Sequence, residues 1–402
     1  MANGGEFSLA WLLQPLTVES FLNDIWATTH HHVARGCAGY FDGLLRGPSA
    51  VDELLEHVRP DPSAVRLVRG GESKQAETYR GADGGLDLGR VRDDFADGYT
   101  IVLNGLERYV RAIASLSHGI EVELNFPVRV NGYITPPQST GFVPHFDPHD
   151  VLVLQIQGSK TWQLSDDTVV PHEMLRGEAV DMAGHALSTA LRLEAGDVLY
   201  LPRGRVHAAE TTCEPSLHLT VGMHAPTALT LLTHALHALS LTDDRVHARL
   251  PPRHLDDPDV RASLTGLVDE VVDTLAKPSV VAQGLGAMEE VLARRGRCPP
   301  VGQFSDAVGI DEHTLVAKVQ PLYSRVAAVA GGVALQFAQL SIGAAADHEA
   351  ALLFLSRSAE PFQVGHLPGL TPAQQTELAR TLIATGFLVR VGDGQAATAD
   401  PH

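Results

Sequence analysis

The sequence predicts an α+β fold in which an antiparallel jelly roll is followed by helices and by a C-terminal winged helix. Residues 119–225 hold short runs of Val, Ile, Leu, Tyr and Phe, punctuated by Gly, Pro and Asp, which are typical of strands in such a barrel. After Pro226 the apolar residues recur at helical spacing, with a break at the two prolines 251–252. The segment LTPAQQTELARTLIATGFLVRV, residues 370–391, indicates a helix that leads into a strand, as in a winged helix.

The segments before the barrel predict a helical lead-in. Residues 9–60 show helical spacing, and Thr17 after Pro15 marks a helix start. The Gly- and Asp-rich segment 66–100 predicts loops and short strands. Because 402 residues exceed one ordinary core, we expect several domains. With a last boundary at the prolines 299–300, the expected domains are residues 1–225, 226–300 and 301–402.

The charge balance argues against one class of partner. The chain has 48 acidic and 30 basic residues and a formal net charge of -18. Binding to nucleic acid needs clustered Lys and Arg, so no nucleic-acid partner is expected. An acidic protein would instead suit a basic protein substrate.

Cysteine usage and hydropathy indicate the compartment. Three scattered cysteines, Cys37, Cys213 and Cys298, are too few for a disulfide framework or a thiolate zinc site, and we expect buried thiols in a reducing environment. The N-terminal apolar run lacks a basic region and is broken by Gln14 and Pro15. No stretch reaches the length that spans a bilayer. The expectation is a cytoplasmic protein without membrane contact.

The strongest chemical signal lies in GFVPHFDPHDVLVLQ, where His145 and Asp147 are two residues apart. If the segment is extended, both side chains leave the same face. GDVLYLPRGRVHAAE supplies His207 as a third ligand from another strand. Two imidazoles and one carboxylate leave three positions open on an octahedral ion, which fits Fe(II) that must bind a co-substrate and O₂. Without the His207 segment, the HxD pattern would read equally well as a surface or core polar pair.

A 2-oxoglutarate co-substrate would need a cation for its far carboxylate, and Lys160 in QIQGSKTWQL is the candidate. Its apolar neighbours argue against a solvated side chain, although a lysine that buries only its stem is the alternative. Asn131 and Tyr133 in VRVNGYITPP could add neutral hydrogen bonds, and a turn role and a core role are their respective alternatives.

These segments together resemble the Jumonji-C-type ribosomal oxygenases, which are cupin-like hydroxylases of ribosomal proteins. The likeness rests on NGYITPP, GFVPHFDPHDVLVLQIQGSKTWQL, GDVLYLPRGRVH and SLHLTVG, and it extends to the opening FSLAWLLQPLTVESFLNDIW. It implies a double-stranded β-helix catalytic domain, a helical region that forms a homodimer, and an acidic winged helix. It also implies that His145, Asp147 and His207 bind iron, that Lys160 grips the 2-oxoglutarate C5 carboxylate, and that Asn131 and Tyr133 line its pocket.

The expected function is hydroxylation of a protein side chain, arginine or histidine at the β-carbon, most plausibly in a basic ribosomal protein. Lys160 resembles the human-type enzymes, whereas the bacterial arginine hydroxylase has arginine there, and Gly222 falls about where the human enzymes carry serine. The target residue therefore stays open. The alternatives are the same chemistry on a peptide natural product and, as a non-enzyme, a dimeric cupin-like scaffold or regulator.

Other histidines are assigned no ligand role. The run His30, His31 and His32 is interpreted as a solvated helix end, because consecutive side chains point in different directions. His218 is expected to line the pocket. His149 is read as either a supporting or an exposed residue, and His224 as a surface or boundary residue.

Overall fold

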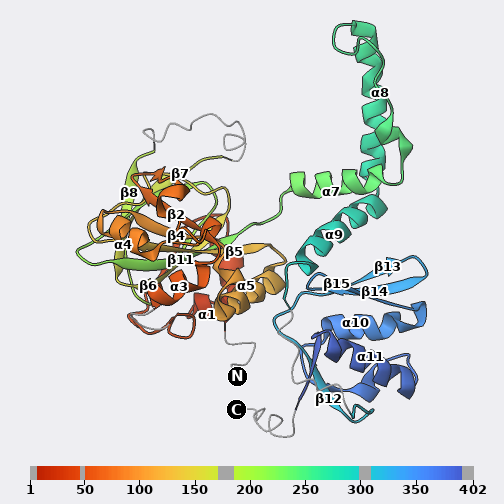
Figure 1. The fold of residues 1–402 in the computed structure, drawn as a ribbon. Helices are drawn as coiled ribbons and strands as arrows, with labels where there is room; N and C mark the ends of the chain where they lie inside the picture. Colours follow the sequence, from red (N-terminus) through yellow and green to blue (C-terminus); the bar gives the residue numbers. More distant parts are fainter. Residues whose placement is uncertain (1–6, 46–49, 171–184, 298–308, 392–402) are drawn as a thin grey trace. The chain divides into compact units, whose positions relative to one another are not determined.

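The computed structural model describes residues 7–45, 50–170, 185–297 and 309–391. The chain forms two compact units, Met1–Ala225 and Pro226–His402 (Figure 1). The predicted boundary at 299–300 lies outside the described residues, so the division into three domains stays a prediction. No helix among the described residues is long and apolar enough to cross a membrane.

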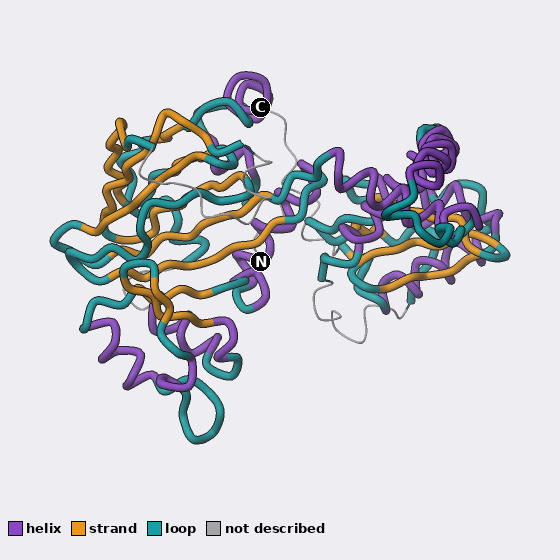
Figure 2. Tube along the Cα trace, turned by 90° about the horizontal axis from the view of Figure 1, so that it is seen from above, coloured by secondary structure: helices purple, strands orange, loops and turns teal. Residues whose placement is uncertain are grey.

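The first unit is built on two antiparallel sheets, which confirms the predicted jelly-roll character (Figure 2). The large sheet has the order β1 (His31–Val33), β9 (Val198–Leu201), β6 (Asp150–Gln157), β11 (Ser216–Met223), β5 (Val128–Thr135), β4 (Thr100–Leu103), β2 (Val65–Arg69) and β3 (Glu72–Ser73). The small sheet has the order β10 (Arg205–Thr211), β7 (Ser159–Thr168) and β8 (Leu187–Glu194).

Strand β6 joins the two hydrophobic cores of this unit. Leu152 and Leu154 belong to the main core, whereas Val151 and Val153, which alternate with them, belong to the smaller core between the sheets. Because both faces of β6 are buried, its sequence is almost continuously apolar. Each such buried side chain contributes about 1.5–3 kcal/mol to stability.

Gly158 lets the chain pass from β6 in the large sheet to β7 in the small one. Its φ is +64°, and an added Cβ would lie 2.1 Å from the carbonyl oxygen of Pro215. A residue with a side chain would therefore be strained there and would also collide with backbone. This glycine fixes where β7 begins and hence where Lys160 lies.

The helical lead-in is confirmed, with α1 (Leu9–Leu13), α2 (Val18–Ser20), a π-helical turn η1 (Phe21–Ile25) and α3 (Ala50–Val58). The hydroxyl of Thr17 caps α2 by accepting from the Ser20 N–H. Two sequence interpretations were incomplete or wrong. The segment read as loops and short strands also contains α4 (Leu88–Ala96), which the Asp87 side chain caps, and residues 119–124 form the end of α5 (Arg111–Leu124) rather than a strand.

The assignment of the cysteines as buried thiols was wrong for two of the three. Cys37 and Cys213 are exposed, and Cys298 lies outside the described residues.

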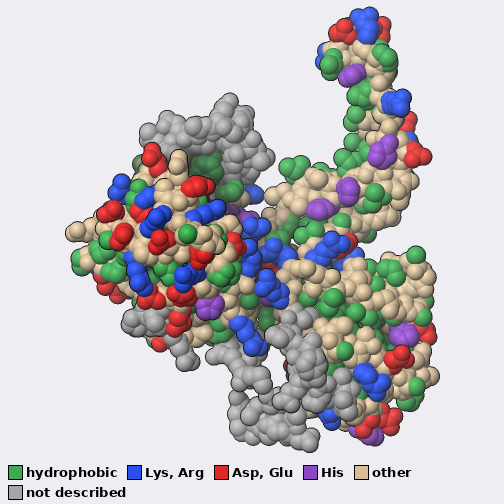
Figure 3. Space-filling model, viewed as in Figure 1, with side chains coloured by type: hydrophobic (Ala, Val, Ile, Leu, Met, Phe, Trp, Pro, Cys, Tyr) green, Lys and Arg blue, Asp and Glu red, His purple; other side chains and the backbone are tan. Residues whose placement is uncertain are grey.

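Acidic and basic side chains are interspersed over the visible surface of the first unit (Figure 3).

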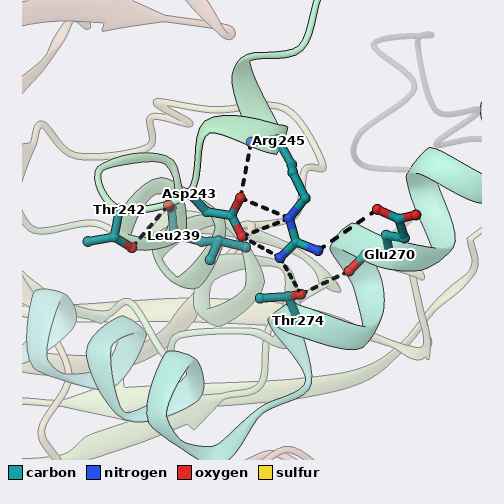
Figure 4. A network of polar contacts seen from close by, with 6 residues as sticks. All are labelled: Leu239, Thr242, Asp243, Arg245, Glu270 and Thr274. Carbon is teal, nitrogen blue, oxygen red and sulfur yellow. Dashed lines mark hydrogen bonds and ion pairs between the residues drawn. The ribbon is translucent and has the colours of Figure 1, made fainter.

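The second unit opens with the predicted helices α7 (Ala228–Ser240), α8 (Pro258–Leu275) and α9 (Pro278–Ala293). Gly284 of α9 lies against Ala235 of α7, and an added Cβ would be 2.9 Å from that of Ala235. The short helix η6 (Asp244–His247) is held to α8 by Arg245 (Figure 4). Its guanidinium donates to Asp243 at 3.0 Å and to the Thr274 hydroxyl at 2.9 Å.

The rest of this unit combines two three-stranded sheets with helices α10 (Glu349–Arg357) and α11 (Pro372–Ala384). One sheet has the order β13 (Arg325–Val329), β14 (Gly332–Phe337) and β15 (Leu340–Ala344); the other has the order β16 (Phe362–Gln363), β12 (Leu315–Lys318) and β17 (Leu388–Arg390). Helix α11 leads into β17, which confirms the predicted helix and strand.

Candidate active site

The HxD segment lies in an extended stretch before β6 rather than within a strand. His145 and His207 form an isolated antiparallel bridge, in which His145 donates its N–H at 3.0 Å and His207 donates back at 2.8 Å. The Gly204 N–H donates to the carbonyl of Asp147 at 2.9 Å. These backbone bonds place the HxD segment beside the start of β10, where His207 stands.

The three predicted ligands come together at this bridge. One ligand atom from each of His145, Asp147 and His207 lies within 4.8 Å of the other two. The distance from His207 Nε2 to the nearer carboxylate oxygen of Asp147 is 3.7 Å. Spacing of this kind lets one ion contact all three side chains.

Both imidazoles are oriented by backbone carbonyls two residues earlier. Nδ1 of His145 lies 2.9 Å from the carbonyl oxygen of Val143, and Nδ1 of His207 lies 2.8 Å from that of Arg205. A carbonyl only accepts, so each Nδ1 carries the proton and each Nε2 keeps its lone pair for a metal. Such support of the distal ring nitrogen is typical of metal-binding histidines.

His207 stays neutral well below neutral pH. Burial, followed by the neighbouring His145, lowers the pKa of His207 to about 4. Since only a neutral imidazole can bind a metal, the site is ready for a cation at physiological pH. Two imidazole nitrogens and a carboxylate are the donor set of non-haem Fe(II) sites.

A cavity of about 270 Å³ runs from these ligands into the space between the two sheets. Trp162 and Ala209 of the small sheet and Val153 of the large sheet supply apolar walls. Lys160, Asn131 and Tyr133 line the same cavity. The structure therefore places all six sequence-predicted site residues around one space.

Lys160 is a buried cation that has no acidic partner among the described residues. Its side chain is 4% exposed, and Nζ donates a 3.0 Å hydrogen bond to the hydroxyl of Thr135. Burial lowers the pKa of Lys160 to about 7. An unpaired buried ammonium is costly, and an anionic ligand in the cavity would remove that cost.

Asn131 and Tyr133 are neighbours on one face of β5, opposite Thr220 and His218 of β11. The Tyr133 ring stacks on that of His218 with centroids 4.8 Å apart. Burial, and next Asp147, raises the pKa of Tyr133 to about 12, so its hydroxyl remains a donor. Asn131 also has a structural role, because its side-chain oxygen accepts from the Gly105 N–H at 3.0 Å.

Several other side chains take part in the cavity wall. His218 lines it as expected, and His149 does too. His224, interpreted as a surface or boundary residue, also lines the cavity and stacks on His149. Thr135, which accepts the hydrogen bond from Lys160 but does not line the cavity, was missed, although the period-two pattern that includes Asn131 and Tyr133 continues to it.

The histidine run does not form a solvated helix end as interpreted. His31 and His32 belong to strand β1, and Nε2 of His32 lies 3.2 Å from the carboxylate of the buried Asp197. The three histidines form no shared metal cluster with one another in the described part of the chain.

Comparison with known proteins agrees with the geometry. Residues 111–231 match the JmjC domain family. The chain is 30% identical over 241 residues to the bifunctional lysine-specific demethylase and histidyl-hydroxylase NO66 of Drosophila yakuba, covering 59% of this chain and 35% of that protein. It is 27% identical over 224 residues to the same protein of Aedes aegypti, covering 55% and 35%. The chain thus spans about a third of these relatives.

Solved structures share the fold over nearly the whole chain. The ribosomal oxygenase YcfD from Escherichia coli has a TM-score of 0.56 at 17% identity, covering 94% of this chain and 98% of that one. The YcfD structure in complex with cobalt and 2-oxoglutarate has a TM-score of 0.57 at 17% identity, covering 94% and 99%. These comparisons confirm the resemblance predicted from the sequence.

Proposed function

We propose that this chain, a member of the Jumonji-C-type ribosomal oxygenase family, is an Fe(II)- and 2-oxoglutarate-dependent oxygenase that hydroxylates a side chain of a protein. The observation that carries the proposal is the pairing of two features in one cavity. A cluster of two imidazoles and a carboxylate lies at one part of it, and the unpaired buried Lys160 at another. The first suits Fe(II), and the second suits the far carboxylate of a dicarboxylic co-substrate.

His145 and His207 would hold Fe(II) through Nε2, and Asp147 through its carboxylate. When bound, Fe(II) and 2-oxoglutarate supply the oxidation of a C–H bond by O₂, in which one oxygen atom enters the substrate and the other enters succinate as CO₂ is lost. Three protein ligands leave positions on the ion for the 2-oxo acid and for O₂.

The chain's other residues orient and shield the reactants. Lys160 would bind the C5 carboxylate as an ammonium, with Thr135 holding its Nζ in place. Tyr133 would donate a hydrogen bond from a hydroxyl that stays protonated. Trp162, 5% exposed, forms part of an apolar wall that keeps bulk water from the reacting centre.

The substrate we propose is a ribosomal protein, with an arginine or a histidine as the hydroxylated residue. Its basic surface would complement a chain whose net charge is -18. The names of the relatives support this choice, since one is a histidyl-hydroxylase and another a ribosomal oxygenase. A scaffold without catalysis would have no use for the oriented ligand histidines and the unpaired lysine.

We further propose that residues 226–300 mediate a homodimer and that the C-terminal region is a winged helix. On α7, Leu229, Leu232 and Leu236 recur at helical spacing and are 63%, 50% and 40% exposed. A stripe of this kind on a helix indicates a surface that is covered by a partner. The helix-to-strand order of α11 and β17 supports the winged-helix assignment. The cytoplasmic location and the absence of a nucleic-acid partner stay predictions.

The experiment compares the wild-type protein with His145→Ala. Purified protein is supplied with Fe(II), ascorbate, O₂ and 2-oxoglutarate, and succinate is measured with and without a ribosomal-protein fraction. We expect Fe(II)-dependent succinate from the wild type and none above background from His145→Ala. His313→Ala, which removes a histidine whose side chain is 77% exposed and which lies outside residues 226–300, is the matched control and should behave as the wild type. Equal succinate from wild type and His145→Ala would refute the assignment.

A further inference from the structure

Arg205 is a buried cation that the proposed chemistry does not use. It opens β10, two residues before His207, and it is 6% exposed. Its Nη1 donates at 2.8 Å to the carbonyl of Ser165 and at 2.7 Å to the carbonyl of Asp166, both in β7. Taking a guanidinium out of water is costly, and these hydrogen bonds have to offset that cost. The place of the two carbonyls therefore indicates what Arg205 does.

Both carbonyls lie in an irregular stretch of the small sheet. Arg205 pairs with Thr168 of β7, and His207 pairs with Leu164. Between these pairs β7 advances by four residues while β10 advances by two, so the intervening residues of β7 have no register partner on β10. The guanidinium supplies donors where the ladder has none. One nitrogen that carries two N–H groups can serve two consecutive carbonyls at once.

The backbone around Arg205 contacts all three metal-ligand residues. The carbonyl of Arg205 accepts from Nδ1 of His207 at 2.8 Å. The preceding residue, Gly204, donates its N–H to the carbonyl of Asp147 at 2.9 Å. His207 exchanges backbone hydrogen bonds with His145. A shift of this stretch of β10 would therefore move the ligand atoms of the cluster relative to one another.

We propose that Arg205 is a positioning residue of the metal site, which preorganises His207 by anchoring the backbone of β10 to the carbonyls of Ser165 and Asp166. The inference rests on the proposed function only for the presence of a metal. It goes beyond that function because Arg205 does not line the cavity. Ligands that are held in place before the ion arrives lose less conformational freedom on binding. Groups that support metal-binding histidines typically change metal affinity by roughly 10- to 100-fold.

A buried arginine that only stabilised the fold would behave differently. Its loss would lower the free energy of unfolding without changing the affinity of the folded protein for a metal ion. Measuring metal binding and stability on the same variants therefore separates the two roles.

The test titrates Co(II) into the metal-free protein in the absence of 2-oxoglutarate. Co(II) takes imidazole and carboxylate ligands as Fe(II) does, and its visible absorption reports the coordination geometry. Isothermal titration gives the dissociation constant, and urea unfolding of the metal-free protein gives its stability. Arg205→Met keeps an apolar stem and removes the guanidinium. We expect it to raise the dissociation constant for Co(II) about tenfold and to alter the absorption spectrum.

Arg35→Met is the matched control. Arg35 lies in the same unit, and its guanidinium also donates to main-chain carbonyls, that of Gln14 at 3.0 Å and that of Leu12. It does not line the cavity. We expect this variant to be less stable than the wild type, with an unchanged Co(II) spectrum and a dissociation constant within about twofold of the wild-type value.

Arg205→Lys separates geometry from charge, and it is the second test if Arg205→Met does not fold. Lysine keeps the positive charge, but its side chain is one atom shorter and lacks the planar fork of a guanidinium. We expect its dissociation constant for Co(II) to exceed that of Arg35→Met.

The outcomes are distinct. Wild-type affinity for Co(II) in folded Arg205→Met, or in Arg205→Lys if the methionine variant does not fold, would overturn the inference. An equal loss of affinity in Arg205→Met and Arg35→Met would also overturn it, because the effect would then follow from stability alone. A wild-type protein that binds neither Co(II) nor Fe(II) would instead refute the proposed function.

Discussion

Lys160 of the small sheet donates a 3.0 Å hydrogen bond to the hydroxyl of Thr135 in the large sheet. No carboxylate of the described residues neutralises this buried ammonium, and burial lowers the pKa of Lys160 to about 7. A buried ammonium without a counter-ion destabilises the ligand-free protein, and a bound anionic ligand removes that cost. Lys160 thereby links the fold to co-substrate binding, and three predictions follow from it.

Replacing Lys160 by methionine should weaken binding of 2-oxoglutarate. A charge-assisted hydrogen bond contributes about 1.5–3 kcal/mol, so the dissociation constant should rise roughly 10- to 100-fold. Isothermal titration of the anaerobic Fe(II) protein with 2-oxoglutarate measures this directly.

Lys318→Met provides the matched control for that titration. Lys318 is also buried, its Nζ donates to the carbonyl of Ser356 at 2.8 Å, and burial lowers its pKa to about 8. Because it lies in the second unit, its replacement should leave 2-oxoglutarate affinity unchanged. Wild-type affinity in Lys160→Met would show that another group holds the far carboxylate.

Binding of 2-oxoglutarate should take up a proton at pH values above 7. The pKa of Lys160 is about 7 in the ligand-free protein, so the side chain loses its proton as the pH rises through that value. A bound carboxylate favours the charged form and restores the proton, and the dissociation constant should therefore rise roughly tenfold per pH unit above 7. Titrations at pH 8 in phosphate and in Tris, whose ionisation enthalpies differ, would report the proton uptake.

The same pKa shift has a consequence for stability. In the unfolded chain Lys160 regains its ordinary pKa of 10.5, so between pH 7 and 10.5 the unfolded state binds more protons than the folded state. The ligand-free wild type should gain stability relative to Lys160→Met as the pH rises through this window. Identical pH dependence of unfolding in the two proteins would contradict the shifted pKa.

The sequence was sufficient to identify residues whose positions follow from local periodicity. Asn131 and Tyr133 share a face because strand side chains alternate, and the same rule reaches Thr135. The same rule gave a wrong prediction for residues 119–124, because polar and apolar residues alternate in EVEL as they would in a strand. The buried residues Ile113, Leu116 and Ile120 instead follow helical spacing up to that point. The local pattern alone did not distinguish the two-residue period of a strand from the 3.6-residue period of a helix.

Other features depend on pairing between distant segments, which one sequence does not disclose. The bridge between His145 and His207 is formed by backbone groups far apart in the chain. The stacking of His224 on His149 follows from the register of β11 with β6, where Met223 pairs with Asp150. Without that register, His224 could only be read as a residue at a strand end.

Tyr200→Phe should destabilise the first unit. The buried Tyr200 hydroxyl donates to the carboxylate of Asp150 at 2.7 Å and accepts from the Ala27 N–H at 2.9 Å. Burial, and next Asp150, raises the pKa of Tyr200, so the hydroxyl keeps its proton. Removing it leaves the buried carboxylate of Asp150 and the N–H of Ala27 each short of one partner, and the free energy of unfolding should fall by about 1–3 kcal/mol.

Urea denaturation followed by circular dichroism tests that value. Tyr99→Phe is the control, because the described residues give the Tyr99 hydroxyl no hydrogen bond, and its ring only faces the cations of Arg69 and Lys74. Its free energy of unfolding should change by no more than about 0.5 kcal/mol. Equal stability of Tyr200→Phe and the wild type would mean that water replaces the hydroxyl.

Charged residues on the exposed face of α7 should dissociate the proposed homodimer. Leu232 and Leu236 are 50% and 40% exposed, whereas Ala235 and Leu239 are buried and pack with Val280. Glutamate at both exposed positions would bury unpaired charge in the interface without replacing the residues that pack against α9. We expect the wild type to have the mass of a dimer in multi-angle light scattering and the double variant Leu232→Glu/Leu236→Glu that of a monomer.

Leu255→Glu distinguishes this interface from a general effect of added charge. Leu255 is 79% exposed and precedes α8, away from the leucine stripe of α7, so its replacement should leave the dimer intact. A wild-type protein that is monomeric at micromolar concentration would refute the dimer. A double variant that stays dimeric would show that the interface does not include α7. Two buried carboxylates without partners would cost more free energy than the association of a standard interface provides.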